Sequence, residues 1–362
     1  MNSKRSISVD ITKGVAIMAI VLGHVSYLYS SNSLVDSEVF IYSLWHVSVF
    51  FILAGFFIKD DQLVQPKLWF KKKFSSLYLK ILYFYVPAVL LHNALIKIGW
   101  YSLESTDPVI NTYSMMDFVK QIVFAICLGG REPIVGAMWF VYVLFMALIG
   151  LSIVSWLIKK LAKDERQYEW MRGIALLAMC IVAGILSNKY GLTIRRFSNT
   201  FTAMLLIYVG KIMYQKMKLS FDNGYLAIIC GLIAFEVACM LGGVALNGNE
   251  YKDILQLLVA APAVLYIIMY IGKHIEANVV GKAIAYVGKD SFYVMALHFV
   301  GFKLCTLALQ GISYGGANLS DLTPVVGSNI LFLLLYAFFG VGFPLLFMWG
   351  FRRGKTIIQK IF

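Results

Sequence analysis

Long apolar segments recur along the whole chain, and no other feature of the sequence constrains the fold as strongly. A helix that spans a bilayer needs roughly 20 mostly apolar residues. Apolar residues make up 60% of the chain and charged residues only 14%, whereas about 25% of a soluble domain is charged. We therefore predict an all-α, polytopic integral membrane protein with about ten transmembrane helices. The predicted spans lie near residues 7–29, 40–58, 77–97, 134–158, 172–187, 199–215, 224–246, 254–272, 290–310 and 328–351.

The connections between these segments are too short to hold a soluble domain. The longest one runs over residues 98–133. It contains an apolar stretch, 118–128, which is too short to cross a bilayer, so we interpret it as an interfacial or re-entrant helix. We expect one membrane domain that covers residues 1–362.

Lysine and arginine are distributed unevenly between alternate loops. With the N-terminus inside, the cytoplasmic segments carry 22 of these residues and the outer segments carry 6. Positive residues are retained on the cytoplasmic side of membranes, so this bias predicts that both termini are cytoplasmic. The same bias accounts for the net charge of +13. No basic face of a soluble domain is implied, and we expect no nucleic-acid partner.

Histidines inside the apolar segments are the strongest candidates for chemistry, because ionisable groups in a membrane are costly and usually functional. His24, His46 and His92 each lie five or six residues from the predicted outer ends of their segments. At 1.5 Å per residue they share one depth, roughly 7–9 Å below that end. Consecutive helices with short connections usually pack together, so these rings are expected to converge. The alternative, which also applies to His298, is that each ring only hydrogen-bonds a neighbouring backbone carbonyl.

A metal site is not expected from these residues. The three histidines come without a carboxylate in the sequence around them. The five cysteines show no CxxC or other metal-ligand spacing, and all lie in apolar segments. They are typical of small buried apolar side chains.

Two clusters of positive charge suit phosphorylated or hydroxyl-rich ligands. The first is a run of three lysines on the predicted cytoplasmic side: Lys71, Lys72 and Lys73. The second consists of three arginines on the predicted outer side, against the general bias: Arg131, Arg195 and Arg196. For the lysines the alternative is simple retention of the loop inside the cell. For the arginines the alternative is contact with lipid phosphate.

Four motifs follow one another along the chain. Residues 8–25 read SVDITKGVAIMAIVLGHV, 45–57 read WHVSVFFILAGFF, 136–145 read GAMWFVYVLF, and 291–299 read SFYVMALHF. In this order they resemble the signatures of membrane acyltransferase family 3. The first combines an acidic residue, a basic residue and a glycine with a later histidine; the others carry an FF-x-[LI]-[SA]-G pattern, a W-F pair and a late histidine.

The resemblance implies a ten-helix enzyme that takes an acyl group, usually acetyl, from cytoplasmic acyl-CoA. That group would pass to a hydroxyl of a carbohydrate or a lipid-linked glycan at the outer face of a bacterial inner membrane. No bound cofactor is implied, since acyl-CoA is the donor substrate. The implied catalytic residues are His24, as general base, and His46. The other matched positions are Asp10, Lys13, Gly14, Trp139 and His298.

In one place the chain departs from the family pattern. Many members carry an R-x-x-R pair at the start of the third helix, where this chain has Lys73 and Ser76. Lysine can neutralise a phosphate but lacks the bidentate fork of arginine. We expect Lys71–Lys73, together with Lys13, to hold the nucleotide end of acyl-CoA.

Two other classes of membrane protein are alternatives. A transporter or flippase for a glycan or lipid would show Gly- or Pro-broken helices in two similar halves, and the sequence shows no such symmetry. A non-catalytic scaffold would have no need of His24. The acyltransferase hypothesis needs it, because an imidazole with a pKa near 6.5 is suited to general base catalysis.

Overall fold

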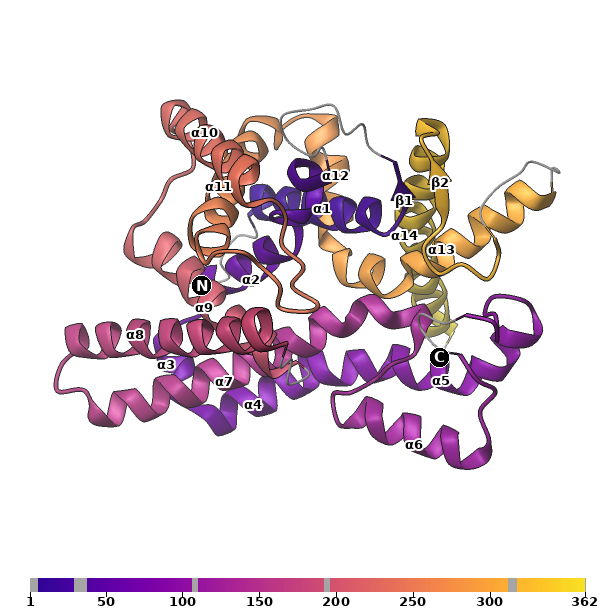
Figure 1. Ribbon diagram of the computed structural model, residues 1–362, viewed down its shortest axis with the longest axis horizontal. Coiled ribbons are helices and arrows are strands. Elements are labelled where there is room, and N and C mark those ends of the chain that lie inside the picture. Colours follow the sequence, from indigo (N-terminus) through magenta and orange to yellow (C-terminus); the bar gives the residue numbers. More distant parts are fainter. Residues whose placement is uncertain (1–5, 29–37, 106–109, 192–195, 312–317, 362) are drawn as a thin grey trace. The chain divides into compact units, whose positions relative to one another are not determined.

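The protein, seen in a computed structural model, is described at residues 6–28, 38–105, 110–191, 196–311 and 318–361. These ranges are almost entirely helical (Figure 1). The α-helices are α1 (Ile7–Gly23), α2 (His46–Phe56), α3 (Asp60–Leu63), α4 (Pro66–Lys73), α5 (Leu79–Lys97), α6 (Met115–Ile126), α7 (Trp139–Leu161), α8 (Glu165–Gly184), α9 (Phe197–Lys211), α10 (Gly224–Leu241), α11 (Ala261–Ile275), α12 (Val279–Lys289), α13 (Ser291–Gly311) and α14 (Ile330–Ile361).

Short segments of other geometry join several of these helices. They are the π-helical turns η1 (Val39–Ser43), η2 (Phe74–Tyr78), η4 (Ile185–Lys189), η5 (Ile212–Lys216) and η6 (Gln256–Ala260), and the 3₁₀ segment η3 (Pro133–Met138). Two short strands, β1 (Ser26–Tyr27) and β2 (Val325–Gly327), pair in parallel.

Eight helical stretches in the described ranges are long and apolar enough to cross a membrane, which confirms the prediction of an all-α polytopic membrane protein. They are Val39–Phe56, Pro66–Lys97, Pro133–Leu161, Glu165–Lys189, Gly224–Leu241, Gln256–Ile275, Ser291–Gly311 and Ile330–Gly354. Each overlaps a predicted span, although Pro66–Lys97 also takes in part of the predicted cytoplasmic loop 59–76. The other two predicted spans correspond to α1, which has only 17 residues, and to α9, whose N-terminal half is rich in Ser, Asn and Thr.

Two segments predicted from the sequence take a more definite form in the structure. Residues 59–76, expected as a cytoplasmic loop, are largely helical, because Pro66 starts α4 in the first helical position, where proline is well tolerated. The stretch 118–128 falls in α6, a helix of 12 residues that begins with a capping box between Ser114 and Asp117. Its place at the membrane interface stays a prediction.

The chain forms two compact units, each assembled from separate stretches of sequence. Unit 1 comprises Met1–Thr12, Ser30–Ile81 and Trp139–Lys282, and unit 2 comprises Lys13–Tyr29, Leu82–Met138 and Ala283–Phe362. The contacts described below all lie within one unit or the other.

In unit 1, α2 packs directly against α9. A Cβ atom on Gly210 of α9 would overlap the carbonyl oxygen of Ile52, and one on Gly55 of α2 would overlap that of Ile207. The two glycines therefore allow the helix backbones to approach closely, as small residues do where membrane helices associate.

Unit 1 also contains a buried cluster of charges. The Arg172 guanidinium is fully buried; its nitrogens lie 2.6 Å from Asp60 Oδ1 and 2.7 Å from Glu169 Oε2. Lys211 is also buried, with Nζ 2.5 Å from Asp60 Oδ2. Burial raises the pKa of Asp60, but the charges of Arg172 and Lys211 outweigh burial and hold that pKa below its ordinary value. The cluster thus pairs buried charges of both signs, as a low-dielectric interior requires.

Contacts within each unit join segments that the charge bias places on the same side of the membrane. The charge cluster of unit 1 joins residues 60, 169 and 211, all at predicted cytoplasmic ends. In unit 2, Lys303 Nζ donates to the carbonyl oxygens of Leu319 and Asp321, both at 2.7 Å, in a predicted outer loop. These contacts agree with the alternation of the predicted loops.

We predict that Gly210→Ala lowers the free energy of unfolding in detergent by about 1–3 kcal/mol, because a methyl group forces α9 away from α2. Thermal unfolding followed by circular dichroism measures the effect. The matched control is Gly342→Ala in α14, where a Cβ would meet no atom of the described chain within 4 Å. Equal losses in the two variants would contradict the close packing of α2 on α9.

Candidate functional site

His24 directly follows the last residue of α1, in the turn that leads into β1. Its Nδ1 lies 2.8 Å from the carbonyl oxygen of Ile20. A carbonyl only accepts hydrogen bonds, so Nδ1 carries the hydrogen and, in the neutral ring, Nε2 keeps its lone pair. Among the described residues nothing hydrogen-bonds to Nε2. The imidazole is therefore fixed in the tautomer that a general base needs.

His298 of α13 lies beside His24 in unit 2, with 5.0 Å between the ring centroids. Its Nδ1 lies 3.0 Å from Val294 O and 3.1 Å from Met295 O, so this ring has the same tautomer. The side chain is fully buried, and its Nε2 has no hydrogen-bond partner in the part of the chain that the structure describes. An unpaired buried polar atom costs about 1–3 kcal/mol. A substrate that donates a hydrogen bond to Nε2 would relieve that cost.

The glycine of the first motif has a structural role. A Cβ on Gly14 would overlap the carbonyl oxygen of Ile284, so α1 and α12 pack backbone to backbone in unit 2. This contact fixes the C-terminal part of α1, which leads directly into His24. Asp10 is buried in the part of α1 that belongs to unit 1, and Lys13 begins the part that belongs to unit 2.

His46 belongs to unit 1, at the first position of α2. Its Nδ1 lies 2.5 Å from the carbonyl oxygen of Tyr42, and the Tyr42 ring meets the imidazole edge-on at 5.6 Å. This is the backbone contact that the alternative interpretation expects. The convergence of His46 with His24 stays a prediction.

Of the predicted outer arginines, Arg196 is the N-cap of α9 with a left-handed φ of 60°. Its Nη1 donates to the carbonyl oxygen of Trp139 at 3.3 Å, and its guanidinium lies 5.1 Å from the centroid of the Tyr142 ring. The structure thus brings Arg196 and Trp139 together. Arg195 lies outside the described residues.

The three lysines occupy the last turn of α4. Lys71 and Lys72 are exposed, whereas Lys73 Nζ lies 4.3 Å from the centroid of the Trp69 ring. Trp69 is buried and donates from Nε1 to the carbonyl oxygen of Leu148 at 2.9 Å. The lysines are therefore presented from one anchored turn rather than from a loop.

A second histidine centre in unit 2 surrounds Glu132, a residue that the sequence did not single out. Glu132 is almost fully buried and lies 2.9 Å from His92 Nδ1. It also accepts hydrogen bonds from the hydroxyls of Tyr101, at 2.7 Å, and Tyr113, at 3.3 Å. Burial, followed by the nearby Glu132, raises the pKa of both tyrosines, so both remain protonated donors. The sequence does offer one signal for Glu132: it is an acidic residue in an outer loop, directly before a predicted span.

His92 has no free nitrogen. Besides the Glu132 contact, its Nε2 lies 3.0 Å from the carbonyl oxygen of Asn111. Its ring stacks on Tyr113 with 3.5 Å between centroids and 4° between planes. His92 therefore positions its neighbours and, with both nitrogens engaged, does not act as a base. Next to this centre is a cavity of about 520 Å³, whose rim includes Arg131.

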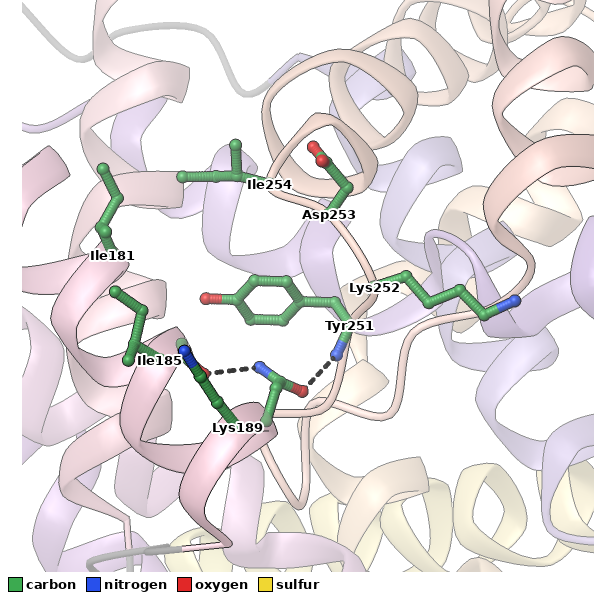
Figure 2. Close-up of a pocket in the computed structure, with 9 residues that line it drawn as sticks. Ile181, Ile185, Lys189, Tyr251, Lys252, Asp253 and Ile254 are labelled. Carbon is green, nitrogen blue, oxygen red and sulfur yellow. Dashed lines mark hydrogen bonds between the residues drawn. The ribbon is translucent and has the colours of Figure 1, made fainter.

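Unit 1 contains another cavity, of about 490 Å³, around the ring of Tyr251 (Figure 2). The ring points between Ile181, Ile185 and Ile254. The backbone N–H of Tyr251 donates to Asn188 Oδ1 at 3.1 Å. Lys189, Lys252 and Asp253 complete the rim. None of these residues belongs to a motif or charge cluster that the sequence predicts as functional.

Residues 6–349 match a family model described as an acyltransferase domain. The chain belongs to this acyltransferase family. The resemblance noted from four short motifs is thereby confirmed, and the protein is a membrane acyltransferase. Searches of curated proteins and of solved structures return no match.

The two histidines that meet in unit 2, His24 and His298, both lie in the part of the acyltransferase that the family model matches. Both histidines come from motif segments within the matched range, 8–25 and 291–299. They are 274 positions apart, and the fold brings their rings into contact. Within the described residues no group of three His, Cys, Asp or Glu side chains is arranged to hold a metal.

We predict that Glu132→Gln lowers the free energy of unfolding of the acyltransferase by about 1–3 kcal/mol, since an amide cannot accept all the hydrogen bonds that the buried carboxylate makes with His92, Tyr101 and Tyr113. Thermal unfolding in detergent measures it. Glu104→Gln, an exposed acid in the same outer loop, serves as the control and is expected to change stability by less than about 0.5 kcal/mol. An unchanged midpoint for Glu132→Gln would show that the buried contacts contribute no net stability.

Proposed function

We propose that this acyltransferase moves an acyl group, acetyl in the simplest case, from cytoplasmic acyl-CoA to a hydroxyl of a carbohydrate or lipid-linked glycan at the outer face of a bacterial inner membrane. The observation that carries the proposal is the contact of His24 with His298, two imidazoles whose Nδ1 atoms are both bound to backbone carbonyls. Each ring has its Nε2 available for a substrate.

In the proposed reaction, His24 Nε2 takes the proton from the acceptor hydroxyl. The hydroxyl oxygen then attacks the thioester carbon, a carbon–oxygen bond forms and the carbon–sulfur bond breaks. The CoA thiolate leaves and takes the proton from His24 Nε2, which returns the ring to its neutral form. The His298 Nε2 accepts a hydrogen bond from a substrate hydroxyl or from a pantetheine amide. A base with a pKa near neutrality suits this proton transfer.

The two substrates reach the base from opposite sides of the membrane. We assign the phosphates of acyl-CoA to Lys71, Lys72, Lys73 and Lys13, and the acceptor to Arg131, Arg195, Arg196 and Trp139. An extended pantetheine arm spans roughly 15–20 Å by comparison with extended backbone. That length lets the thioester reach a histidine in the outer half of the bilayer while the nucleotide stays inside. His46 is proposed as a second catalytic residue on the family resemblance alone.

The first test of the proposal is the loss of the base. His24→Ala is expected to lower acyl transfer by two to four orders of magnitude, the range general base catalysis contributes. The assay incubates purified protein with ¹⁴C-acetyl-CoA and a panel of glycans. His274→Ala is the matched control, because His274 makes the same contact with the carbonyl four residues earlier, Tyr270 O, at 2.8 Å but is exposed. Near wild-type transfer by His24→Ala would remove His24 from the reaction.

The second test concerns the donor. Replacing Lys71, Lys72 and Lys73 by glutamine is expected to raise the KM for acyl-CoA about tenfold, equivalent to about 1.4 kcal/mol, and to change kcat less. The control removes the same number of exposed lysines from another predicted cytoplasmic segment: Lys159, Lys160 and Lys163. Equal KM changes in the two triple variants would mean that the α4 lysines attract acyl-CoA only through the long-range electrostatic field of the protein and do not bind it directly.

A further inference from the structure

The cavity of about 520 Å³ in unit 2 has the size of a small-molecule site, for which roughly 300–1,000 Å³ is usual. Its walls come from three separate parts of the sequence: the end of α5, the segment before α6 with α6 itself, and the segment before η3. All of them belong to unit 2 and to the predicted outer side.

The back wall of this cavity is held rigidly. His92 is locked between Glu132 and Asn111 O and stacks on Tyr113. Tyr101 donates to Glu132 and accepts from the backbone N–H of Ile134. Because these groups satisfy one another, the wall offers a fixed surface and no reactive group.

The rim, in contrast, carries polar groups with unused hydrogen-bonding capacity. Asp117 and Gln121 lie four residues apart, on one face of α6. The Oδ2 atom of Asp117 accepts from Ser114, but within the described chain its Oδ1 accepts nothing, and the Gln121 amide makes no hydrogen bond there. Arg131 also lines the cavity, and its guanidinium lies 5.2 Å from the centroid of the Phe124 ring of α6.

These three side chains end in planar polar groups of complementary type. A carboxylate accepts, a guanidinium donates and an amide does both. Neighbouring hydroxyl groups of a sugar ring present donors and acceptors in pairs, which such groups can match. The charges of Asp117 and Arg131 cancel, so the rim favours an uncharged ligand over an anionic one.

We infer that this cavity binds an uncharged saccharide, as the subsite that holds the acceptor of the proposed acyl transfer. Asp117, Gln121 and Arg131 bind its hydroxyls, and the His92–Glu132 centre supports the wall against which it rests. Only the identification of this saccharide as the acyl acceptor rests on the proposed function. Saccharide binding itself can be measured without turnover.

The experiment measures binding of the purified full-length protein in detergent to an array of neutral di- to tetrasaccharides, with oligosaccharides of uronic acids beside them. Wild-type protein is expected to bind members of the neutral set, and Gln121→Ala and Arg131→Ala to bind them at least tenfold more weakly. Lys120→Gln, on α6 but outside the cavity lining, is expected to bind as the wild type does. Thermal unfolding of each variant verifies that it is folded.

Three results would overturn the inference: no binding of any neutral saccharide, equal affinity in wild type and both cavity variants, or preference for the uronic acids. A saccharide that binds through the cavity without any acyl transfer by the wild type would contradict the proposed function and leave the saccharide site standing. If the wild type transfers acyl groups but neither variant changes the KM for the acceptor, the proposed function stands and the cavity is not the acceptor site.

Discussion

Every polar group of a chain that lies in lipid has to find its partner within the chain, and this constraint governs the whole structure. Helices satisfy the hydrogen-bonding groups of the backbone. Where charged side chains are buried, they are grouped: Arg172 and Lys211 with two carboxylates, His92 with Glu132, and Lys303 with two loop carbonyls. Among the described residues four buried side-chain atoms have no hydrogen-bond partner: Ser155 Oγ, Glu169 Oε1, Arg172 Nε and His298 Nε2. Of these, His298 Nε2 belongs to a ring that lies beside a second histidine.

That second histidine of the acyltransferase is His24, 5.0 Å away between ring centroids. Each ring uses Nδ1 to bind a carbonyl of its own segment, and the same contact that satisfies Nδ1 leaves a lone pair on Nε2. The proposed reaction uses these two lone pairs, one to take a proton and one to accept a hydrogen bond from the substrate. The close packing of Gly14 on Ile284 holds the helix that leads into His24, so the glycine and the histidine of the first motif are structurally linked.

Much of the fold could be read from the sequence, because apolar segment length and alternating loop charge are local properties. The site could be read only in part. The motif histidines 24 and 298 were found by their setting in apolar segments, but their contact depends on packing between distant segments. Glu132 was missed because a single acid in an outer loop looks solvated until the fold buries it beside His92. The lysines of α4 were placed in a loop, since their polarity hid the helix that Pro66 begins.

The central claim is that the imidazole directly after the first helix meets a thioester supplied from the cytoplasm. The most direct measurement is a cryo-EM structure with bound ethyl-CoA, a thioether that cannot transfer its ethyl group. The account predicts density for the sulfur beside the His24 ring and for the nucleotide phosphates at Lys71–Lys73. A ring of His24 that faces lipid, or a sulfur separated from it by packed side chains, would contradict the account.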